Sequence, residues 1–400
     1  MASSSSNNSY SECSGCSDSS TLVWEHEAFN TFQFNVLVFA LNNMWPDAEL
    51  NDIIVERLKG GGYNRIIGFS YEGNGHTNSA EARYILRLPR LTDAQVDRDV
   101  AVLHFLEKYT EIPVPRVITF DNTDDNEFES PYMIQNRIPG TGLLSTFPSL
   151  DHAEKLRFAR ELGDVFRRML TIRSHAAGSL TFLPGQEDLK AEFCVVPFGS
   201  RDTRLATPYY NTEATAQTVR GLLLSRFQDQ IAYTLKHYPT STLKLEILDK
   251  FCSMAWELEA RGWFDNVPNC LAHLDLAPRN ILVNPTSDPQ QPIISAVLDW
   301  DSAVLVPQFM ACTPPCWIWA WLEDEDEDEK TANDDPPTEE QRQLKKTFEK
   351  AAGGEYMRFA YEPAYRLARR LLRFAIDGEI RSNEDLTEAE EMLKEWETIR

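Results

Sequence analysis

In the first third of the chain, apolar residues alternate with polar ones or gather in short runs, a pattern typical of β-strands. The predicted strands lie in residues 50–71, where two strands flank a glycine-rich turn, and in residues 81–90 and 131–140. One amphipathic helix interrupts them over residues 92–109, because its apolar residues recur at helical spacing. The pattern therefore predicts a small, sheet-rich N-terminal lobe that ends near Pro139 and Gly140.

Beyond this break the periodicity becomes helical. The helical segments lie in residues 151–170, about 217–237, 243–261 and most of the chain from about 340. The only clear strands in this part are residues 281–284 and 293–298, which a turn rich in proline, aspartate and serine joins into a hairpin. We therefore predict a two-lobed α+β fold, with a small sheet-rich N-lobe and a larger, mainly helical C-lobe that holds one hairpin.

Three polar side chains stand at the ends of this hairpin. Asp275 and Asn280 precede its first strand, and Asp299 follows its second. Because antiparallel strands return the chain to its starting end, we expect Asn280 and Asp299 to lie close together at the hairpin mouth. The oxygens of that pair suit Mg²⁺, which leaves its other positions to water and phosphate oxygens. Asp275 would then orient a substrate hydroxyl and take its proton, as phosphoryl transfer requires.

Each of these residues also has a purely structural interpretation. Aspartate and asparagine are common in turns, so Asp275 or Asn280 could simply cap the loop. The spacing of all three polar residues around one hairpin favours a site over independent caps. His273, two residues before Asp275, is interpreted as a packed, hydrogen-bonded structural histidine rather than a catalytic one.

The hairpin motifs carry a family resemblance. HLDLAPRN (273–280) and VLDWD (297–301) closely resemble the catalytic loop and the metal motif of the aminoglycoside phosphotransferase family. That family's pattern reads H-G-D-L-H-P-x-N, then an apolar strand pair, then I-D-W-E or I-D-W-D. Leu274 and Ala277 replace its glycine and its second histidine, and neither change removes an acid or a metal ligand. With the upstream features, the likeness covers most of residues 50–380.

The resemblance implies a protein-kinase-like fold in a family member of fungal type. In that fold Asp275 would be the catalytic base, and Asn280 and Asp299 would hold Mg²⁺. The role of Asp301 stays open, with a second metal or an indirect contact as the options.

The resemblance also implies ATP binding in the N-lobe. The candidate nucleotide-binding residues are Gly60, Gly61, Gly62, Arg87, Asp99, Gln135 and Arg137. The glycines lie between two predicted strands and would let the backbone approach phosphates, with a plain flexible turn as the alternative. Backbone groups of about residues 135–137 resemble the hinge that meets the adenine edge, although a buried strand explains this segment equally well.

Arg87 stands where kinase-like folds usually carry a lysine, and its forked guanidinium suits phosphate oxygens. Such a cation normally pairs with an acid on the following helix. Asp99 is the predicted partner, because its spacing from Val96 and Leu103 places it on the apolar side of that helix. A solvated Asp99 at the helix border is the alternative.

Charge narrows the possible partners. The chain carries 39 Lys and Arg against 62 Asp and Glu, a net charge of −23, so nucleic acid and membrane surfaces are poor partners.

Residues 1–20 are Ser-rich and expected to be disordered, and they lack the features of a signal peptide, which predicts a cytoplasmic protein. The acidic loop 323–340 is interpreted as solvated, with attraction of a cationic substrate as the alternative. Trp317, Trp319 and Trp321 are interpreted as core.

These patterns predict a tail (1–20), an N-terminal nucleotide-binding lobe with an N-terminal helix (21–138) and a C-terminal catalytic and substrate-binding lobe (139–400). The expected activity is ATP- and Mg²⁺-dependent phosphoryl transfer to a hydroxyl of a small molecule, such as a cationic amino alcohol or an aminoglycoside-like compound. A catalytically silent, kinase-like binding or scaffold protein is the main alternative, because of the substitutions at Arg87 and Asp99. A protein kinase is disfavoured, since the chain has no D-F-G and no A-P-E motif.

Overall fold

The chain forms two compact units, each described here by itself. The computed structural model describes residues 29–58, 64–72, 82–90, 96–183, 189–199, 212–285, 288, 290–321, 329–376 and 380–400. Unit 1 comprises the described residues up to Val96 together with Ile118–Arg137, and unit 2 comprises Asp97–Val117 and Ile138–Arg400. Within these described ranges, no helix has the length and apolar character needed to cross a membrane.

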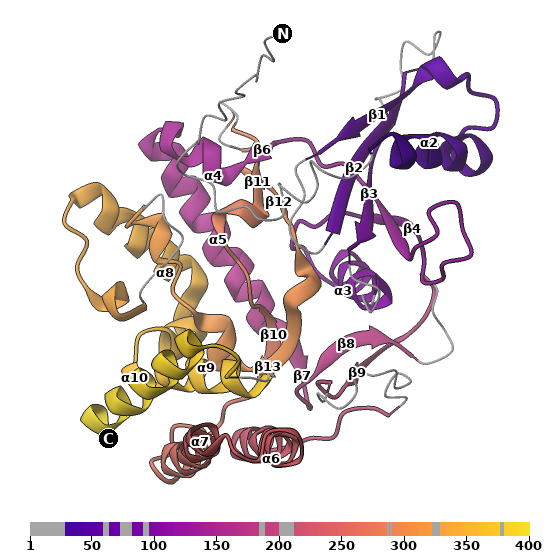
Figure 1. Cartoon of the computed structure of the whole chain (residues 1–400). Coiled ribbons are helices and arrows are strands. Elements are labelled where there is room, and N and C mark those ends of the chain that lie inside the picture. Colours follow the sequence, from indigo (N-terminus) through magenta and orange to yellow (C-terminus); the bar gives the residue numbers. More distant parts are fainter. Residues whose placement is uncertain are drawn as a thin grey trace, which may run out of the picture. The chain divides into compact units, whose positions relative to one another are not determined.

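Unit 1 is built on a five-stranded sheet with the strand order β1-β2-β3-β5-β4 (Figure 1). Its strands are β1 (Ile53–Arg57), β2 (Asn64–Tyr71), β3 (Ala82–Pro89), β4 (Val117–Asp121) and β5 (Tyr132–Asn136). The pairs β1–β2, β2–β3 and β3–β5 are antiparallel. The strands predicted from the alternating pattern are thus confirmed.

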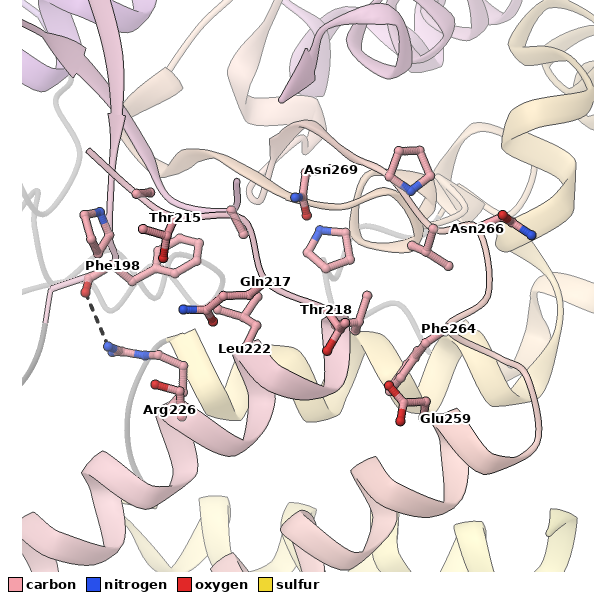
Figure 2. A pocket seen from close by; sticks show the side chains of 18 of the residues that line it. Phe198, Thr215, Gln217, Thr218, Leu222, Arg226, Glu259, Phe264, Asn266 and Asn269 are labelled. Carbon is pink, nitrogen blue, oxygen red and sulfur yellow. Dashed lines mark hydrogen bonds between the residues drawn. The ribbon is translucent and has the colours of Figure 1, made fainter. Parts of the chain in front are cut away.

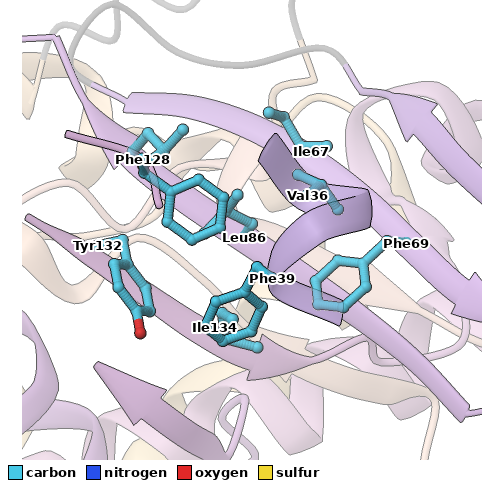
Figure 3. Packing of buried hydrophobic residues seen from close by; sticks show 9 residues of the cluster. Val36, Phe39, Ile67, Phe69, Leu86, Phe128, Tyr132 and Ile134 are labelled. Atoms are coloured by element: carbon cyan, nitrogen blue, oxygen red, sulfur yellow. The ribbon is translucent and has the colours of Figure 1, made fainter. Parts of the chain in front are cut away.

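In the described part of unit 1, helix α2 (Phe29–Phe39) covers this sheet. Helix α2 continues into a short π-helical turn (Ala40–Met44), and a single 3-10 turn (Leu50–Asp52) leads into β1. Figure 3 shows Val36 and Phe39 of α2 lying against Ile67, Leu86 and Ile134 of the sheet, and all of these side chains are buried. Burial of this apolar face is what holds a single helix on the sheet.

Unit 2 is mainly helical, as the 3.6-residue periodicity predicted for the C-lobe, and it also includes most of the helix that was predicted within the N-lobe. Its helices are α3 (Val96–Tyr109), α4 (Leu143–Thr146), α5 (His152–Thr171), α6 (Val219–His237), α7 (Thr242–Ala260), α8 (Glu339–Ala360), α9 (Pro363–Ile376) and α10 (Asn383–Ile399). Helix α5 begins in a capping box, in which Asp151 accepts from the Glu154 backbone N–H. It packs closely on α8 at Gly163, where a Cβ atom would lie 2.6 Å from the Phe348 carbonyl oxygen.

Three small sheets complete unit 2, with the strand orders β13-β10-β7, β12-β11-β6 and β8-β9. Their strands are β6 (Thr141–Gly142), β7 (Arg173–Ser174), β8 (Ser179–Phe182), β9 (Phe193–Val196), β10 (Asn269–His273), β11 (Ile281–Val283), β12 (Ile294–Val297) and β13 (Ala303–Pro307). The predicted hairpin is confirmed as β11 and β12, which pair antiparallel. The prediction that these were the only clear strands was incomplete, because short buried strands such as β10 and β13 carry no alternation.

The strands of two different sheets meet around the HLDLAPRN segment. Strand β10 ends at His273, which pairs with Ala303 at the start of β13. Strand β11 begins at Ile281, which pairs with Val297 near the end of β12. The two connecting segments, residues 274–280 and 298–302, are therefore held side by side at the same ends of both ladders.

The tryptophan-rich segment belongs to the core of unit 2. Trp317 and Trp319 are buried, and the Trp321 ring stacks on Phe147 with 4.5 Å between ring centroids. The predicted acidic loop begins in residues 322–328, which lie outside the described part of the chain. From Glu329 it continues as a 3-10 segment (Glu329–Asn333).

Candidate active site

Both carboxylate oxygens of Asp275 are held by neighbours on its own loop. Arg279 forms an ion pair with Oδ1. The side-chain amide of Asn280 donates to Oδ2 at 2.9 Å and to the Asp275 carbonyl oxygen at 2.8 Å. A 3-10 turn (Pro278–Asn280) makes these contacts possible, because it folds residues 279 and 280 back toward residue 275.

Asn280 is bonded through its backbone to the residue that precedes Asp299. The Leu298 N–H donates to the Asn280 carbonyl oxygen at 2.7 Å, directly beyond the β11–β12 pairing. Asp299 follows with φ of 62°, a left-handed conformation that aspartate and asparagine tolerate better than most residues. The hairpin thus brings Asn280 next to the residue that precedes Asp299, while the proximity of the Asn280 and Asp299 side chains and their role as metal ligands stay predictions.

His273 is confirmed as a structural residue of this loop. It is buried and its Nε2 lies 2.9 Å from the Leu298 carbonyl oxygen, while the Asp275 N–H donates to its Nδ1 at 3.2 Å. Nδ1 is therefore the acceptor and Nε2 carries the proton. Burial lowers the pKa of His273, so the ring is neutral, and it packs on Trp300 with 4.7 Å between centroids. Through these two hydrogen bonds, the neutral ring connects the segment that holds Asp275 with the segment that precedes Asp299.

Two further residues support the hairpin region from helices that the sequence did not connect with it: one contacts the catalytic loop, and the other holds the opposite end of the hairpin. Arg373 of α9 donates to the Leu274 carbonyl oxygen at 3.0 Å. The carboxylate of Glu161, on α5, accepts from the backbone N–H groups of Ile293 and Ile294 at 2.9–3.0 Å and so holds the start of β12. Burial raises the pKa of Glu161, and those two N–H groups oppose the rise. No local pattern marks either residue, because each acts on a segment more than ninety positions away.

The donor set at the hairpin mouth fits a hard cation with few protein ligands. The amide nitrogen of Asn280 is directed at Asp275, which leaves its oxygen as the atom suited to a metal. In the described ranges no three His, Cys, Asp or Glu side chains gather into a metal site of their own. A magnesium ion here would depend on Asn280, Asp299, water and phosphate oxygens, which is the ligand pattern that Mg²⁺ accepts.

The predicted nucleotide residues are distributed over both units. Gly60, Gly61 and Gly62 lie outside the described residues, between β1 and β2. Arg87 is buried on β3 of unit 1, whereas Asp99 lies on α3 in unit 2 and is half-buried. Their ion pair therefore stays a prediction.

Asp97 is an acid on α3 that sequence reasoning missed. It is 3% exposed, and it shares a helix face with the buried residues Val100 and Ala101. The same spacing argument that singled out Asp99 would have found it, since Val100 and Ala101 lie three and four positions further on.

Gln135 and Arg137 belong to the sheet of unit 1. Gln135 is buried and pairs with Ile85 in the ladder between β3 and β5. The Arg137 N–H donates to the Arg83 carbonyl oxygen at 3.0 Å, and its side chain forms an ion pair with Glu56 at 2.9 Å. Their proposed contact with adenine stays a prediction.

A cavity of about 850 Å³ lies elsewhere in unit 2 (Figure 2). Its walls include Asn269 and Pro307, which pair at the ends of β10 and β13 away from the catalytic loop. Arg226 lines it and donates to the Phe198 carbonyl oxygen at 3.3 Å, the dashed line in Figure 2. None of the candidate catalytic or nucleotide-binding residues lines this cavity.

Comparison with protein families decides the relationship of the chain. The model of the phosphotransferase enzyme family matches residues 57–309, which include the whole hairpin site. The chain belongs to the phosphotransferase enzyme family. This phosphotransferase-family chain is 23% identical over 266 residues to a subtelomeric hrmA-associated cluster protein of Aspergillus fumigatus strain Af293, a match that covers 53% of the chain and 50% of that relative. The chain thus spans about half the length of the curated relatives it matches.

Solved structures confirm the fold of this family member. The crystal structure of aminoglycoside phosphotransferase APH(2'')-Ib in its ADP-bound form aligns with a TM-score of 0.52 and 12% sequence identity, over 90% of this chain and 97% of that one. At this identity the likeness concerns the fold alone. It confirms the predicted kinase-like α+β class.

Proposed function

We propose that the protein transfers the γ-phosphoryl group of ATP to a hydroxyl of a small molecule in the presence of Mg²⁺. Family membership supports phosphotransferase chemistry. The observation that carries the proposal is the position of Asp275, whose carboxylate is oriented by Arg279 and Asn280 at the hairpin mouth, where Asn280 is bonded through its backbone to the residue that precedes Asp299. This arrangement supplies a base and a metal-binding pair at one end of one hairpin.

In this proposal the residues of unit 2 divide the work. Asp275 accepts a hydrogen bond from the acceptor hydroxyl and takes its proton as the phosphoryl group is transferred. Asn280 and Asp299 hold Mg²⁺, which when bound neutralises charge on the phosphate oxygens. His273 keeps both loops in register without exchanging a proton, because its ring is buried and neutral.

Nucleotide binding is proposed for unit 1. Gly60, Gly61 and Gly62 would approach the phosphates through backbone N–H groups, and the forked guanidinium of Arg87 would bind phosphate oxygens. Backbone groups near Gln135 would meet the adenine. The ADP bound to APH(2'')-Ib is consistent with this assignment.

The acceptor is proposed to be a small hydroxylated molecule that carries positive charge. The chain has a net charge of −23, which attracts cations toward its surface. Measuring ATP turnover against a library of hydroxylated metabolites, with amino alcohols and aminoglycosides in one arm and neutral sugars in another, tests both the activity and this preference. A silent scaffold would bind nucleotide and turn over with none of them.

Asp299→Asn tests the metal site without disturbing the base. Asparagine is tolerated at the left-handed φ of 62°, so the backbone should be kept, while the negative charge facing the metal is lost. We expect the Mg²⁺ concentration that gives half-maximal nucleotide binding or turnover to rise by at least ~10-fold, as for changes around bound metals generally.

Asp288→Asn is the matched control, because Asp288 lies in the turn at the other end of the same hairpin and is exposed. Its Mg²⁺ midpoint should equal that of the unaltered protein. An unchanged midpoint in Asp299→Asn would remove Asp299 from the metal site.

Arg87→Ala tests the nucleotide side. Removal of a buried guanidinium that binds phosphate should weaken ATP binding by roughly 10-fold or more, in line with charge-assisted hydrogen bonds of about 1.5–3 kcal/mol. A double-mutant cycle with Asp99→Ala, read by fluorescent-nucleotide titration, measures the predicted coupling.

The same cycle with Asp97→Ala is the comparison, because Asp97 is the more buried acid of α3. Coupling of Arg87 to Asp97 and none to Asp99 would transfer the predicted pairing to Asp97. If the Arg87→Ala variant bound ATP with unaltered affinity, Arg87 would be excluded as a residue that binds the ATP phosphates.

A further inference from the structure

Arg279 stands in direct contact with the group proposed as the base. Its guanidinium pairs with Oδ1 of Asp275, while Asn280 occupies Oδ2. The only other basic side chain of the segment 273–280 is His273, which is buried with a lowered pKa and hydrogen-bonded on both ring nitrogens. Arg279 is therefore the one permanent cation that the catalytic loop itself supplies.

A contribution to folding stability does not explain why the ion pair between Arg279 and Asp275 is present. The side chains of Arg279 and Asp275 are 41% and 39% exposed. Ion pairs as exposed as this contribute little to the free energy of unfolding. The loop is instead anchored by groups that do not involve the Arg279 charge, namely the buried His273, the Asn280 amide and the bond from Arg373 to the Leu274 carbonyl oxygen.

The reach of the guanidinium follows from the reaction geometry. A base must lie about 2.6–3.2 Å from the hydroxyl whose proton it takes. That hydroxyl oxygen must lie about 3–3.5 Å from the phosphorus it attacks. The guanidinium of Arg279 already contacts the base. A change in its side-chain rotamer would therefore bring it to the oxygens of the phosphoryl group that is transferred. Its five N–H donors can serve a carboxylate and a phosphoryl oxygen at the same time.

We propose that Arg279 is a catalytic residue that orients Asp275 and donates a hydrogen bond to a non-bridging oxygen of the phosphoryl group during its transfer. The inference rests on the proposed function. As the acceptor oxygen forms its bond to phosphorus, the bond from phosphorus to the bridging oxygen breaks and its electron pair leaves with ADP. The proton of the hydroxyl moves to Asp275. Arg279 keeps its own protons and stabilises the charge on the equatorial oxygens.

Arg279→Gln tests the assignment, with Arg279→Lys as the conservative variant. We expect the glutamine variant to lower kcat by about 10²-fold, the scale for loss of one preorganised donor, while KM for ATP changes by less than about 3-fold. Lysine keeps the charge without the fork, so it should recover part of kcat. Arg167→Gln is the matched control, because Arg167 makes a similarly exposed ion pair with Asp164 on the outside of α5.

A second measurement separates catalysis from loop structure. Aluminium fluoride with ADP and Mg²⁺ mimics the phosphoryl group in transfer, whereas ADP alone does not. The unaltered protein should bind ADP more tightly when aluminium fluoride is added, and Arg279→Gln should lose that increment with its affinity for ADP alone unchanged. Equal increments in both proteins, or an undiminished kcat in Arg279→Gln, would overturn the role of Arg279.

Failure of the inference and failure of the proposed function give different results. If Asp275→Asn abolishes turnover while Arg279→Gln turns over like the unaltered protein, only the role of Arg279 is lost. If Asp275→Asn and the unaltered protein turn over equally, or neither turns over with any acceptor, the proposed function itself fails.

Discussion

Replacing Asp275 by asparagine is expected to lower phosphoryl transfer by ~10²-fold or more while ATP binding persists. Asparagine keeps the shape of the side chain and removes its basicity. Its side chain also offers one acceptor oxygen where the carboxylate offers two, so the side chain of residue 275 loses its bond either to Arg279 or to Asn280. Turnover, nucleotide affinity and the thermal midpoint should therefore be measured on the same preparation.

Asp249→Asn is the control for this prediction, because Asp249 is exposed on α7 and lies outside both the catalytic loop and the acidic loop. It should match the unaltered protein in all three measurements. Where no acceptor has been identified, the slow hydrolysis of ATP by water serves as the readout. Turnover of Asp275→Asn at the unaltered rate would exclude Asp275 as the base and favour the silent-scaffold interpretation.

Replacing Arg369 by methionine is expected to lower the free energy of unfolding by about 3–5 kcal/mol, the range for breaking a buried charge pair from one side. Arg369 lies on α9 and is 2% exposed. It pairs with Glu329 at 2.8 Å, and it also donates to the carbonyl oxygens of Phe309, Phe359 and Ala360. Methionine has a similar length but no donor, so a carboxylate and three carbonyl groups would lose their partner.

Arg167→Met provides the comparison, since its ion pair with Asp164 is largely exposed and should change the free energy of unfolding by no more than about 1 kcal/mol. Urea denaturation followed by tryptophan fluorescence measures both variants. Equal stability of the two would mean that the Arg369 network is replaced by water or by rearranged neighbours.

Four of the five strands of unit 1 and the long helices of unit 2 could be predicted because each depends on local periodicity, whereas β4 was not predicted. Helix α5 has one buried face, and the spacing of its apolar residues reveals that face before any partner is known. The hairpin of β11 and β12 was predictable for a related reason: its turn residues and its two apolar runs are close in sequence. The expected convergence of Asn280 and Asp299 followed from that pairing alone.

Other parts of the site depend on contacts that local patterns do not encode. Strand β10 is a short buried run whose partners, β7 and β13, lie far from it in sequence. Glu161 supports β12 from a distance of 132 residues, and Arg373 reaches the catalytic loop from 99 residues away. A single sequence carries no record of which distant segment will satisfy a buried N–H or carbonyl group.

The sequence by itself thus determined the two kinds of lobe, the hairpin and the identity of the acid and amide residues at its mouth, because periodicity, turn chemistry and spacing are local properties. Only the tertiary structure decided that the partners of His273 are Leu298 and Asp275, that Arg279 pairs with Oδ1 of Asp275, and that Asp97 is more buried than Asp99. Burial and pairing of a polar group depend on everything that packs around it, and those neighbours are brought together only when the chain folds.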